Sequence, residues 1–121
     1  MDCIFCKIIN GDIPSYTIYE DDMVKVFLDA NPHSNGHMLI ISKEHFLDIM
    51  DIEKDVLTYI YKDITPKMYK LLQDKLGIDG LKICQNNGIA QEVKHYHVHL
   101  IPTYKQRYEL LDIKEIYGKL V

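Results

Sequence analysis

The stretch that decides the fold is residues 95–101, HYHVHLI, in which histidines and apolar residues alternate. Alternate residues of a β-strand share one face, so this stretch predicts a strand with three imidazoles on one side. Successive residues on one face lie about 6.5–7 Å apart. We assign the other face, formed by Tyr96, Val98 and Leu100, to the core. The imidazole face then belongs to a functional site or to solvent.

The imidazole face has three interpretations from the residues alone. Three histidines on a solvated strand would need no function, although strict alternation of this kind disfavours chance. Two histidines at positions i and i+2 can also ligate one Zn²⁺. The third interpretation is a nucleophilic imidazole, because neutral imidazole attacks phosphorus readily and a partner can fix its tautomer.

The rest of the chain predicts an antiparallel sheet. Two alternating segments flank an acidic turn and form a hairpin, and further short apolar runs are bounded by turn residues. We expect the last strand to stop at Pro102. The predicted strands are residues 15–20, 23–29, 37–42, 81–85 and 93–101.

Two segments have the apolar spacing of helices. The first predicts a long helix over about residues 53–76. Pro66 removes one hydrogen bond from this helix and should kink or split it, and Gly77 is suited to end it. Residues 108–120 predict a short terminal helix. Hairpins with separate helices indicate the α+β class.

The composition is that of one globular domain, which we place at residues 1–121. Hydrophobic residues make up 47% and charged residues 26% of the chain, close to the usual globular values. The net charge of −4 disfavours a nucleic-acid partner, which usually requires a basic face. No apolar run approaches the roughly 18–20 residues of a membrane span, so we expect no membrane partner. The first residues lack a signal-peptide pattern, which favours the cytoplasm and reduced cysteines.

The alternating stretch resembles the signature of the histidine triad (HIT) family of nucleotide hydrolases and transferases. That signature reads His, apolar, His, apolar, His, apolar, apolar. Other landmarks resemble the family in the same order and cover residues 3 to about 104. They are CIFCKII at 3–9, Ile13-Pro14, Glu20-Asp21-Asp22, Leu28-Asp29, GHMLII at 36–41 with Lys43 and His45, and Asn86-Asn87-Gly88. The resemblance implies a HIT-like fold with a five-stranded antiparallel sheet, and a homodimer.

The resemblance implies covalent catalysis by the middle histidine of the triad, His97. This residue would attack the α-phosphorus of a purine nucleotide conjugate, such as a nucleoside 5′-phosphoramidate or an acyl-nucleotide. The resulting nucleotidyl-histidine would then be hydrolysed by water. His99 would donate to the phosphate oxygens or the leaving group, and His37 would brace the site. The competing role for His37 is that of a strand histidine outside catalysis.

The resemblance also implies a nucleotide-binding set around these histidines. Asp29 would accept from the ribose hydroxyls, and Asn86 would lie beside the phosphate. Main-chain N–H groups near residues 91–93 would hold anionic oxygens. The competing role is a cap for Asp29, and a turn contact with its own backbone for Asn86. The expected set is Phe27, Asp29, Ala30, Asn86, Gln91 and Val93, with Phe5 or Ile8 as further candidates.

Cys3 and Cys6 have the spacing of zinc ligands. A redox pair of this spacing belongs next to a strand of a thioredoxin-like unit, and no strand pattern precedes these two. The resemblance implies that His45 and His95 complete a closed Cys₂His₂ set around a structural zinc ion. The alternative makes both cysteines small core residues and leaves His95 hydrogen-bonded within the triad. Cys84 has no second motif, and we expect it in a buried strand.

Departures from the family pattern affect the phosphate pocket. Only Ile89 and Ala90 separate Gly88 from Gln91, which shortens the loop that shapes this pocket. A carboxylate that faced the phosphate would repel it, so we expect Glu92 to point away. The chain also has no Trp, whereas the resembling phosphoramidase branch ends in a Trp-containing segment.

Three functions compete at this point. The first is a HIT-family nucleotide phosphoramidase-like hydrolase, or a related enzyme that cleaves dinucleoside polyphosphates. The second is a nucleotide-binding protein with little turnover. The third is a structural zinc domain, which would leave His97 and His99 without a role. The catalytic histidines favour the enzyme.

Overall fold

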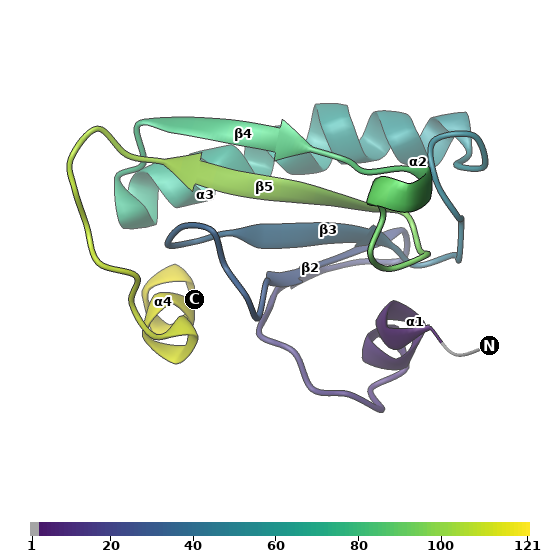
Figure 1. Ribbon diagram of the computed structural model, residues 1–121, viewed down its shortest axis with the longest axis horizontal. Helices are drawn as coiled ribbons and strands as arrows, with labels where there is room; N and C mark the ends of the chain where they lie inside the picture. The colour runs from purple at the N-terminus through teal and green to yellow at the C-terminus, as the bar shows by residue number, and fades with distance from the viewer. Residues whose placement is uncertain (1–2) are drawn as a thin grey trace.

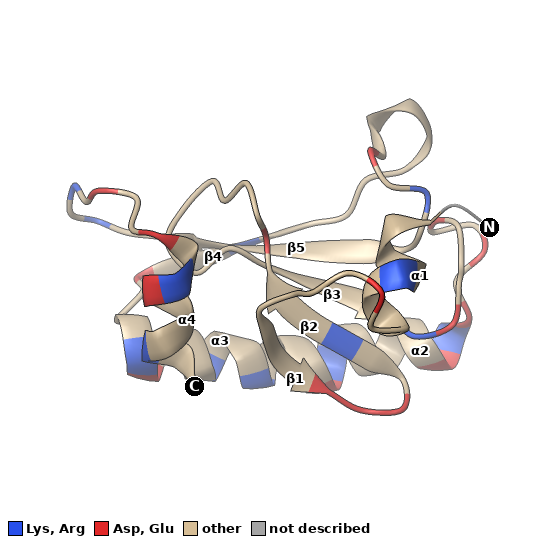
Figure 2. Cartoon of the chain, turned by 90° about the horizontal axis from the view of Figure 1, so that it is seen from below, with Lys and Arg blue, Asp and Glu red and all other residues tan. Residues whose placement is uncertain are grey.

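The computed structural model describes residues 3–121, and in this range five antiparallel strands form one sheet in the order β1-β2-β3-β5-β4 (Figures 1 and 2). The α+β class predicted from the sequence is confirmed. The long helical segment covers one face of the sheet, and a short N-terminal helix lies against the other. The strands are β1 (Thr17–Glu20), β2 (Val24–Leu28), β3 (Met38–Ser42), β4 (Gly80–Cys84) and β5 (His97–Thr103).

The sheet face under the long helical segment carries the larger apolar core. Val26, Ile40 and Val98 lie in register across β2, β3 and β5 and are fully buried. Tyr96 and Leu100 are buried in the same core, so the apolar side of the alternating stretch packs as predicted. Each such side chain contributes about 1.5–3 kcal/mol when it leaves water. This burial fixes which way the intervening histidines point.

The opposite face is covered in part by α1 (Ile4–Ile9), which the sequence analysis had not assigned as a helix. Phe5 and Ile8 are its buried residues, and the ring of Phe5 meets that of Phe27 edge-on at 5.8 Å. The Nζ atom of Lys25 donates to the carbonyl of Ile8 at 3.2 Å. A cation is favourable at the C-terminal end of a helix. These contacts hold α1 against the histidine-bearing side of the sheet.

The predicted long helix is present but contains a π-helical turn. The main-chain N–H and the hydroxyl of Thr65 both donate to the carbonyl of Ile60, five residues back. Pro66 follows this π-helical turn directly, so its missing N–H falls where the regular i→i−4 hydrogen bonding is already interrupted. Gly77 ends the helix in the left-handed conformation. The three parts are α2 (Lys54–Tyr59), η1 (Ile60–Ile64) and α3 (Thr65–Leu76).

β5 begins later than predicted, at His97 rather than at residue 93. The main-chain N–H of Tyr96 donates to the carbonyl of Phe46 at 2.7 Å, so this part of the chain bonds to a loop and not to a strand. The residue before it, His95, therefore lies in a bend. Its ring still lies on the α1 side of the sheet, because Phe5 packs edge-on against the rings at both 95 and 97.

The predicted end of β5 at Pro102 is also wrong, since the strand continues to Thr103. β5 pairs with β3 only as far as Leu100, and beyond that residue it pairs with β4 alone. A strand with one neighbour accommodates proline because its open side requires no N–H. Because β5 extends to Thr103, every residue of β4 is paired with a residue of β5.

The terminal helix α4 (Ile113–Leu120) starts later than the predicted residue 108. Asp112 is its N-cap and accepts a hydrogen bond from the main-chain N–H of Lys114 at 2.8 Å. The ring of Tyr117 contacts that of Tyr16 at 5.1 Å. The last helix thereby lies beside the segment that leads into β1, on the side of the chain where the main pocket opens.

Gly36 allows the chain to enter β3 close to α3. Its φ of 93° is unfavourable for residues with a side chain. A Cβ atom there would also lie 2.7 Å from Leu76 and 2.9 Å from Leu72. Glycine is therefore required at this approach. The residue that follows it, His37, arrives buried directly before β3.

Charged residues recur along α2 and α3, whereas β3 and β5 carry no Lys, Arg, Asp or Glu (Figure 2). In residues 3–121, no helix is both long enough and apolar enough to cross a membrane. Residues 3–121 form one sheet with its covering helices. The homodimer implied by the resemblance remains a prediction.

Candidate active site and metal cluster

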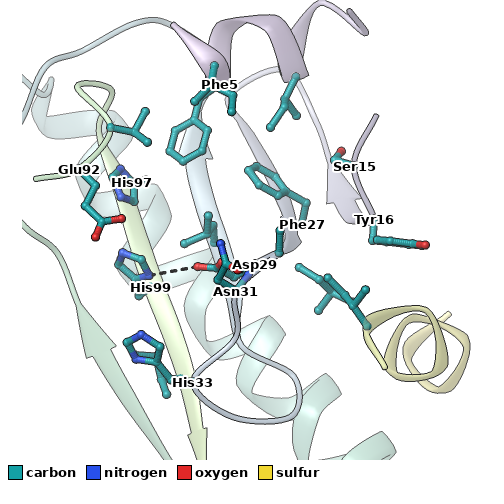
Figure 3. A pocket seen from close by; sticks show the side chains of 18 of the residues that line it. Phe5, Ser15, Tyr16, Phe27, Asp29, Asn31, His33, Glu92, His97 and His99 are labelled. Carbon is teal, nitrogen blue, oxygen red and sulfur yellow. Dashed lines mark hydrogen bonds and ion pairs between the residues drawn. The ribbon is translucent and has the colours of Figure 1, made fainter. Parts of the chain in front are cut away.

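A pocket of ≈ 710 Å³ opens on the α1 side of the sheet. This volume lies within the range of about 300–1,000 Å³ that small-molecule sites occupy. Aromatic and aliphatic side chains from α1 and β2 line one end, and the polar groups at the other end include His97, His99 and Glu92 (Figure 3). No Lys or Arg is among the described residues that line it. An anion bound here would have to be held by neutral donors.

His97 is fixed in the tautomer of a nucleophile. Its Nδ1 atom lies 2.7 Å from the carbonyl oxygen of His95. A carbonyl only accepts, so Nδ1 carries the proton and donates. The lone pair is therefore on Nε2, and the ring lines the pocket. Burial lowers the pKa of His97, which keeps the imidazole neutral and able to attack at neutral pH.

His37 and His99 form a relay whose protons are also determined by geometry. The main-chain N–H of His33 donates to Nδ1 of His37 at 3.0 Å, so neutral His37 carries its proton on Nε2. That Nε2 lies 3.0 Å from Nδ1 of His99 and donates to it. His99 therefore presents Nε2–H as a donor. Burial lowers the pKa of His37 to about 4 and also lowers the pKa of His99.

Asp29 lies at the end of β2 and has two roles. Its Oδ1 atom accepts from the main-chain N–H of Asn31 at 2.8 Å, which is the capping role that had competed with ribose binding. Its Oδ2 atom lies 3.5 Å from Nε2 of His37 and 3.9 Å from Nδ1 of His99; Figure 3 marks the second contact. The carboxylate also lines the pocket. Capping and contact with a ligand are therefore compatible at this residue.

The four predicted zinc ligands lie together. Cys3, Cys6, His45 and His95 each offer one ligand atom, all within 4.8 Å of one another. His95 Nε2 lies 2.7 Å from the carbonyl oxygen of Ser42, to which it donates. Its Nδ1 is therefore unprotonated and faces the two thiols. A histidine ligand is normally oriented in this way by a hydrogen bond from its other nitrogen.

The distances within this cluster suit a tetrahedral ion. Zn–S and Zn–N bonds of about 2.3 and 2.0–2.1 Å place neighbouring ligand atoms roughly 3.3–3.8 Å apart. His95 Nδ1 lies 3.4 Å from Cys3 Sγ and 3.6 Å from Cys6 Sγ, and Cys6 Sγ lies 3.2 Å from His45 Nδ1. These three distances lie close to that range, so the donor set is of the kind that holds a zinc ion.

A second group of metal-ligand type, Asp29, His37 and His99, lies beside the pocket. The proton positions argue against a metal ion there. His37 accepts at Nδ1 from the His33 N–H, so its Nε2 is protonated and has no lone pair for a metal. Proton relay is the better description of this group.

Most of the predicted nucleotide-binding residues line the pocket, and one does not. Gln91 is buried, and its Nε2 atom donates to the carbonyl of Leu47 at 2.6 Å, so its side chain points away from the pocket. Its main-chain N–H, expected to hold an anion, donates instead to the carbonyl of Gly88 at 3.0 Å. The expectation that Glu92 points away is wrong, because its side chain lines the pocket and turns toward the catalytic histidines (Figure 3). Those that line it are Phe27, Asp29, Ala30, Asn86 and Val93, together with Phe5 and Ile8.

Several lining residues were not predicted from the sequence. Ser15 and Tyr16 precede β1, Ile113 begins α4, and Cys84 ends β4 opposite His99. Cys84 is half-buried rather than a buried strand residue. The alternation of residues 15–20 predicted a strand, but it did not indicate that the first residues of this segment line a pocket. Long-range packing of the chain end against this segment supplies that wall.

A five-stranded antiparallel sheet that presents a neutral histidine beside a histidine relay defines a histidine triad protein. The comparisons agree. Residues 10–106 match the HIT domain. An uncharacterized HIT-like protein of Methanocaldococcus jannaschii is 43% identical over 116 residues, which cover 94% of this chain and 88% of that protein. This chain belongs to the HIT domain family.

Two further relatives bear on the site. The adenosine 5′-monophosphoramidase of Saccharomyces cerevisiae is 45% identical over 102 residues, which cover 83% of this chain and 61% of that enzyme. A Zn-bound histidine triad family protein from Mycobacterium smegmatis superposes with a TM-score of 0.89 at 31% identity, over 99% of this chain and 91% of that chain.

Proposed function

We propose that this protein is a nucleotide phosphoramidase-like hydrolase that cleaves at the α-phosphate of an adenosine or other purine nucleotide conjugate. The observation that carries the proposal is the tautomer of His97, whose Nδ1–H donates to the carbonyl of His95 and whose Nε2 lone pair is left for the pocket. A protein that only bound nucleotides would have no need of a fixed nucleophile.

The first step transfers the nucleotidyl group to the protein. Nε2 of His97 forms a bond to the α-phosphorus as the bond from phosphorus to the leaving nitrogen breaks, and the leaving amine takes up a proton from solvent. The imidazole becomes positively charged, and the hydrogen bond from its Nδ1–H to the carbonyl of His95 strengthens. His99 donates its Nε2–H to a phosphate oxygen, as a preorganised donor for the developing negative charge.

The second step returns the enzyme to its starting state. A water oxygen forms a bond to phosphorus, the bond to Nε2 of His97 breaks, and the water proton leaves to solvent. Nucleoside monophosphate is the product. Division into two displacements lowers each barrier relative to direct attack by water. The relay through His37 keeps the donor at His99 available in both steps.

The lining of the pocket orients the nucleotide. Phe5 and Phe27 meet edge-on at the apolar end, which suits a purine ring and its hydrophobic burial. Asp29 lies between this end and the histidines, where a ribose would reach it. The absence of Lys and Arg from the described lining residues favours a conjugate with a single phosphate over a dinucleoside polyphosphate, whose added negative charges would have no cation to meet.

The test is release of AMP from adenosine 5′-phosphoramidate, followed by chromatography for wild type and His97→Ala. We expect steady release by the wild type and none above background for the variant. Lys70→Ala, on the exposed surface of α3, controls for substitution and purification as such and should match wild type, whereas His97→Ala reports any contaminating activity. Release that survives in His97→Ala would refute the nucleophile. No release by a folded wild type would favour a nucleotide-binding role.

We also propose that Cys3, Cys6, His45 and His95 hold a structural zinc ion. Four protein ligands make a closed site, so the bound ion would contribute cohesion and no open position for substrate. Its ligands come from α1, the loop after β3 and the bend before β5. The ion would therefore tie α1, which forms one wall of the pocket, to the segment that carries the nucleophile.

Elemental analysis of the purified protein tests the zinc proposal. One zinc per chain is expected for the wild type, and much less than one for Cys3→Ser. Cys84→Ser is a matched control, because its thiol lies outside the cluster and its loss should leave the metal content unchanged. A full complement of zinc in Cys3→Ser would contradict the ligand assignment.

A further inference from the structure

Glu92 places a carboxylate in the pocket beside the catalytic histidines. The residue is exposed to solvent at this wall, and Figure 3 shows its side chain turned toward His97 and His99. The negative charge of Glu92 therefore lies close to the position that the reacting phosphorus must occupy.

Among residues 91–94, Glu92 is the charged residue that lines the pocket, beside the apolar Val93. Gln91 is anchored away from the pocket through its bond to Leu47. The Nζ atom of Lys94 donates to the carbonyls of Gly88 and Gln91 at 2.7 and 3.0 Å. The cation closest in sequence is thus used to close the loop. The carboxylate is presented to the pocket without a Lys or Arg among the described lining residues.

Glu92 lies on the side of the pocket where the leaving group of a bound substrate would be. The nucleoside must occupy the end of the pocket that contains Phe5 and Phe27, because that end is apolar. The reacting phosphorus must lie at His97. In Figure 3, Glu92 lies on the opposite side of the ring of His97 from Phe27 and Tyr16. A group attached to the phosphorus and directed away from the nucleoside therefore approaches Glu92.

We propose that Glu92 selects the leaving group by charge, so that phosphoramidates of positively charged amines are preferred over conjugates with an anionic leaving group. The inference rests on the proposed function and adds a substrate class to it. In the preferred reaction the bond from phosphorus to the amine nitrogen breaks, that nitrogen takes up a proton, and a second ammonium group on the amine lies near Glu92. A sulfate, a polyphosphate or a carboxylate at the same position is repelled.

The size of the effect follows from Coulomb's law. Glu92 is exposed, so we take an effective dielectric constant of about 40, between the values for a pair near a protein surface and for bulk water; two unit charges about 6–8 Å apart then change a rate constant by roughly tenfold. The effect should weaken at high ionic strength, because the carboxylate is exposed and the Debye length falls to about 3 Å at 1 M salt. Charge selection is therefore measurable as a ratio of specificity constants.

The experiment uses three adenosine 5′-phosphoramidates with the same P–N bond and leaving groups of different charge. These are the adducts of 1,4-diaminobutane, 1-aminobutane and 4-aminobutanoate, with charges of +1, 0 and −1 on the distal end. For the wild type, kcat/KM should fall in that order. For Glu92→Gln, we expect roughly tenfold lower kcat/KM for the cation, roughly tenfold higher for the anion, and a change under about threefold for the neutral adduct.

Controls distinguish the possible failures. Glu53→Gln makes the same chemical change at the exposed N-terminus of α2 and should keep the wild-type order. High salt should flatten the order for the wild type and leave Glu92→Gln unaffected. An equal fall for all three adducts in Glu92→Gln, or an unchanged order, would overturn charge selection alone. Failure of the wild type to hydrolyse the neutral adduct would overturn the proposed function and this inference together.

Discussion

His95 and His97 are two residues apart and lie on the same side of the sheet, yet they have opposite tautomers. His95 donates from Nε2 to the carbonyl of Ser42 and keeps Nδ1 free, so Nδ1 faces two thiols, as the proposed zinc site requires. His97 donates from Nδ1 to the carbonyl of His95 and keeps Nε2 free for the pocket. The difference shows that the role of each imidazole is set by the carbonyl that accepts its proton.

The comparison also shows that the two sites share one residue. The side chain of His95 belongs to the metal cluster, while its main-chain carbonyl orients His97. The ring of Phe5 packs against both imidazoles at 5.9 and 5.0 Å. A change in the metal cluster is therefore transmitted to the nucleophile through a carbonyl and a ring, whereas loss of the nucleophile leaves the cluster intact.

The largest expected effect separates the two histidines outright. His97→Ala should lower kcat/KM for adenosine 5′-phosphoramidate by roughly 10³-fold or more, because the covalent route is lost. The zinc content of this variant should remain that of the wild type. His95→Ala should instead lose the metal. A variant at His97 that lost its zinc would remove the distinction between the two sites.

The next effect tests the relay that supports the catalytic side. In His37→Leu, nothing donates to Nδ1 of His99, so its Nε2–H is no longer guaranteed. We expect kcat to fall about 10- to 100-fold. This fall is smaller than, or similar to, the fall in kcat when an oxyanion donor is removed altogether. His37→Gln offers an amide that can both donate and accept and should recover part of the loss. Equal activity in Leu and Gln variants would argue against a relay of protons.

A smaller effect on activity is expected from the metal side. Cys6→Ser should lower kcat/KM about tenfold through displacement of α1 and of the His95 carbonyl. It should also lower the free energy of unfolding by several kcal/mol, because a folded-state metal site is lost. Cys84→Ser is the control for stability. If thermal unfolding of Cys6→Ser matched that of wild type, the cluster would have no structural role.

The smallest effect at neutral pH, and a growing one in acid, concerns His37. In the unfolded chain its pKa is about 6.5, and in the folded protein burial lowers that pKa to about 4. Above pH 6.5 neither state binds the proton. Between pH 6.5 and about 4 only the unfolded state binds the proton. The free energy of unfolding therefore decreases as the pH is lowered through this range, by up to about 3 kcal/mol.

Melting temperatures from pH 7.5 to 4.5 test this dependence. His37→Gln should lose less stability over that window than wild type, with both proteins compared at the same metal content because acid also displaces metal from thiolates. Parallel melting curves for the two proteins would show that His37 does not contribute to the acid sensitivity.

The strands and the long helix were predictable because their burial has a period. Val98 and Leu100 alternate with histidines on β5, and the helical spacing located α2 and α3 despite Pro66. The start of β5 was not predictable, since nothing local shows that the N–H of Tyr96 bonds to Phe46. Periodicity reports which side chains are buried. It does not report where a main-chain donor finds its acceptor.

The site was predicted in its residues more than in its geometry. The four residues assigned to the zinc site lie together, His97 and His99 line the pocket, and His37 contacts His99. Their catalytic and metal-binding roles stay predictions. Glu92 was placed wrongly because repulsion by a phosphate was assumed to decide its direction. The contacts that orient this segment are a hydrogen bond from Gln91 to a residue far away in the sequence and the hydrogen bonds of Lys94 that close the loop. Neither has a sequence signature.

The alternation of β5 has an evolutionary consequence. Because successive side chains face opposite sides of the sheet, a single inserted or deleted residue between His97 and His99 would send one of these imidazoles into the apolar core and bring a core residue into the pocket. Pairing with β3 on one side and β4 on the other leaves no slack to absorb it. This strand is therefore open to change by substitution and closed to change in length, so new specificities must arise in the loops beside it.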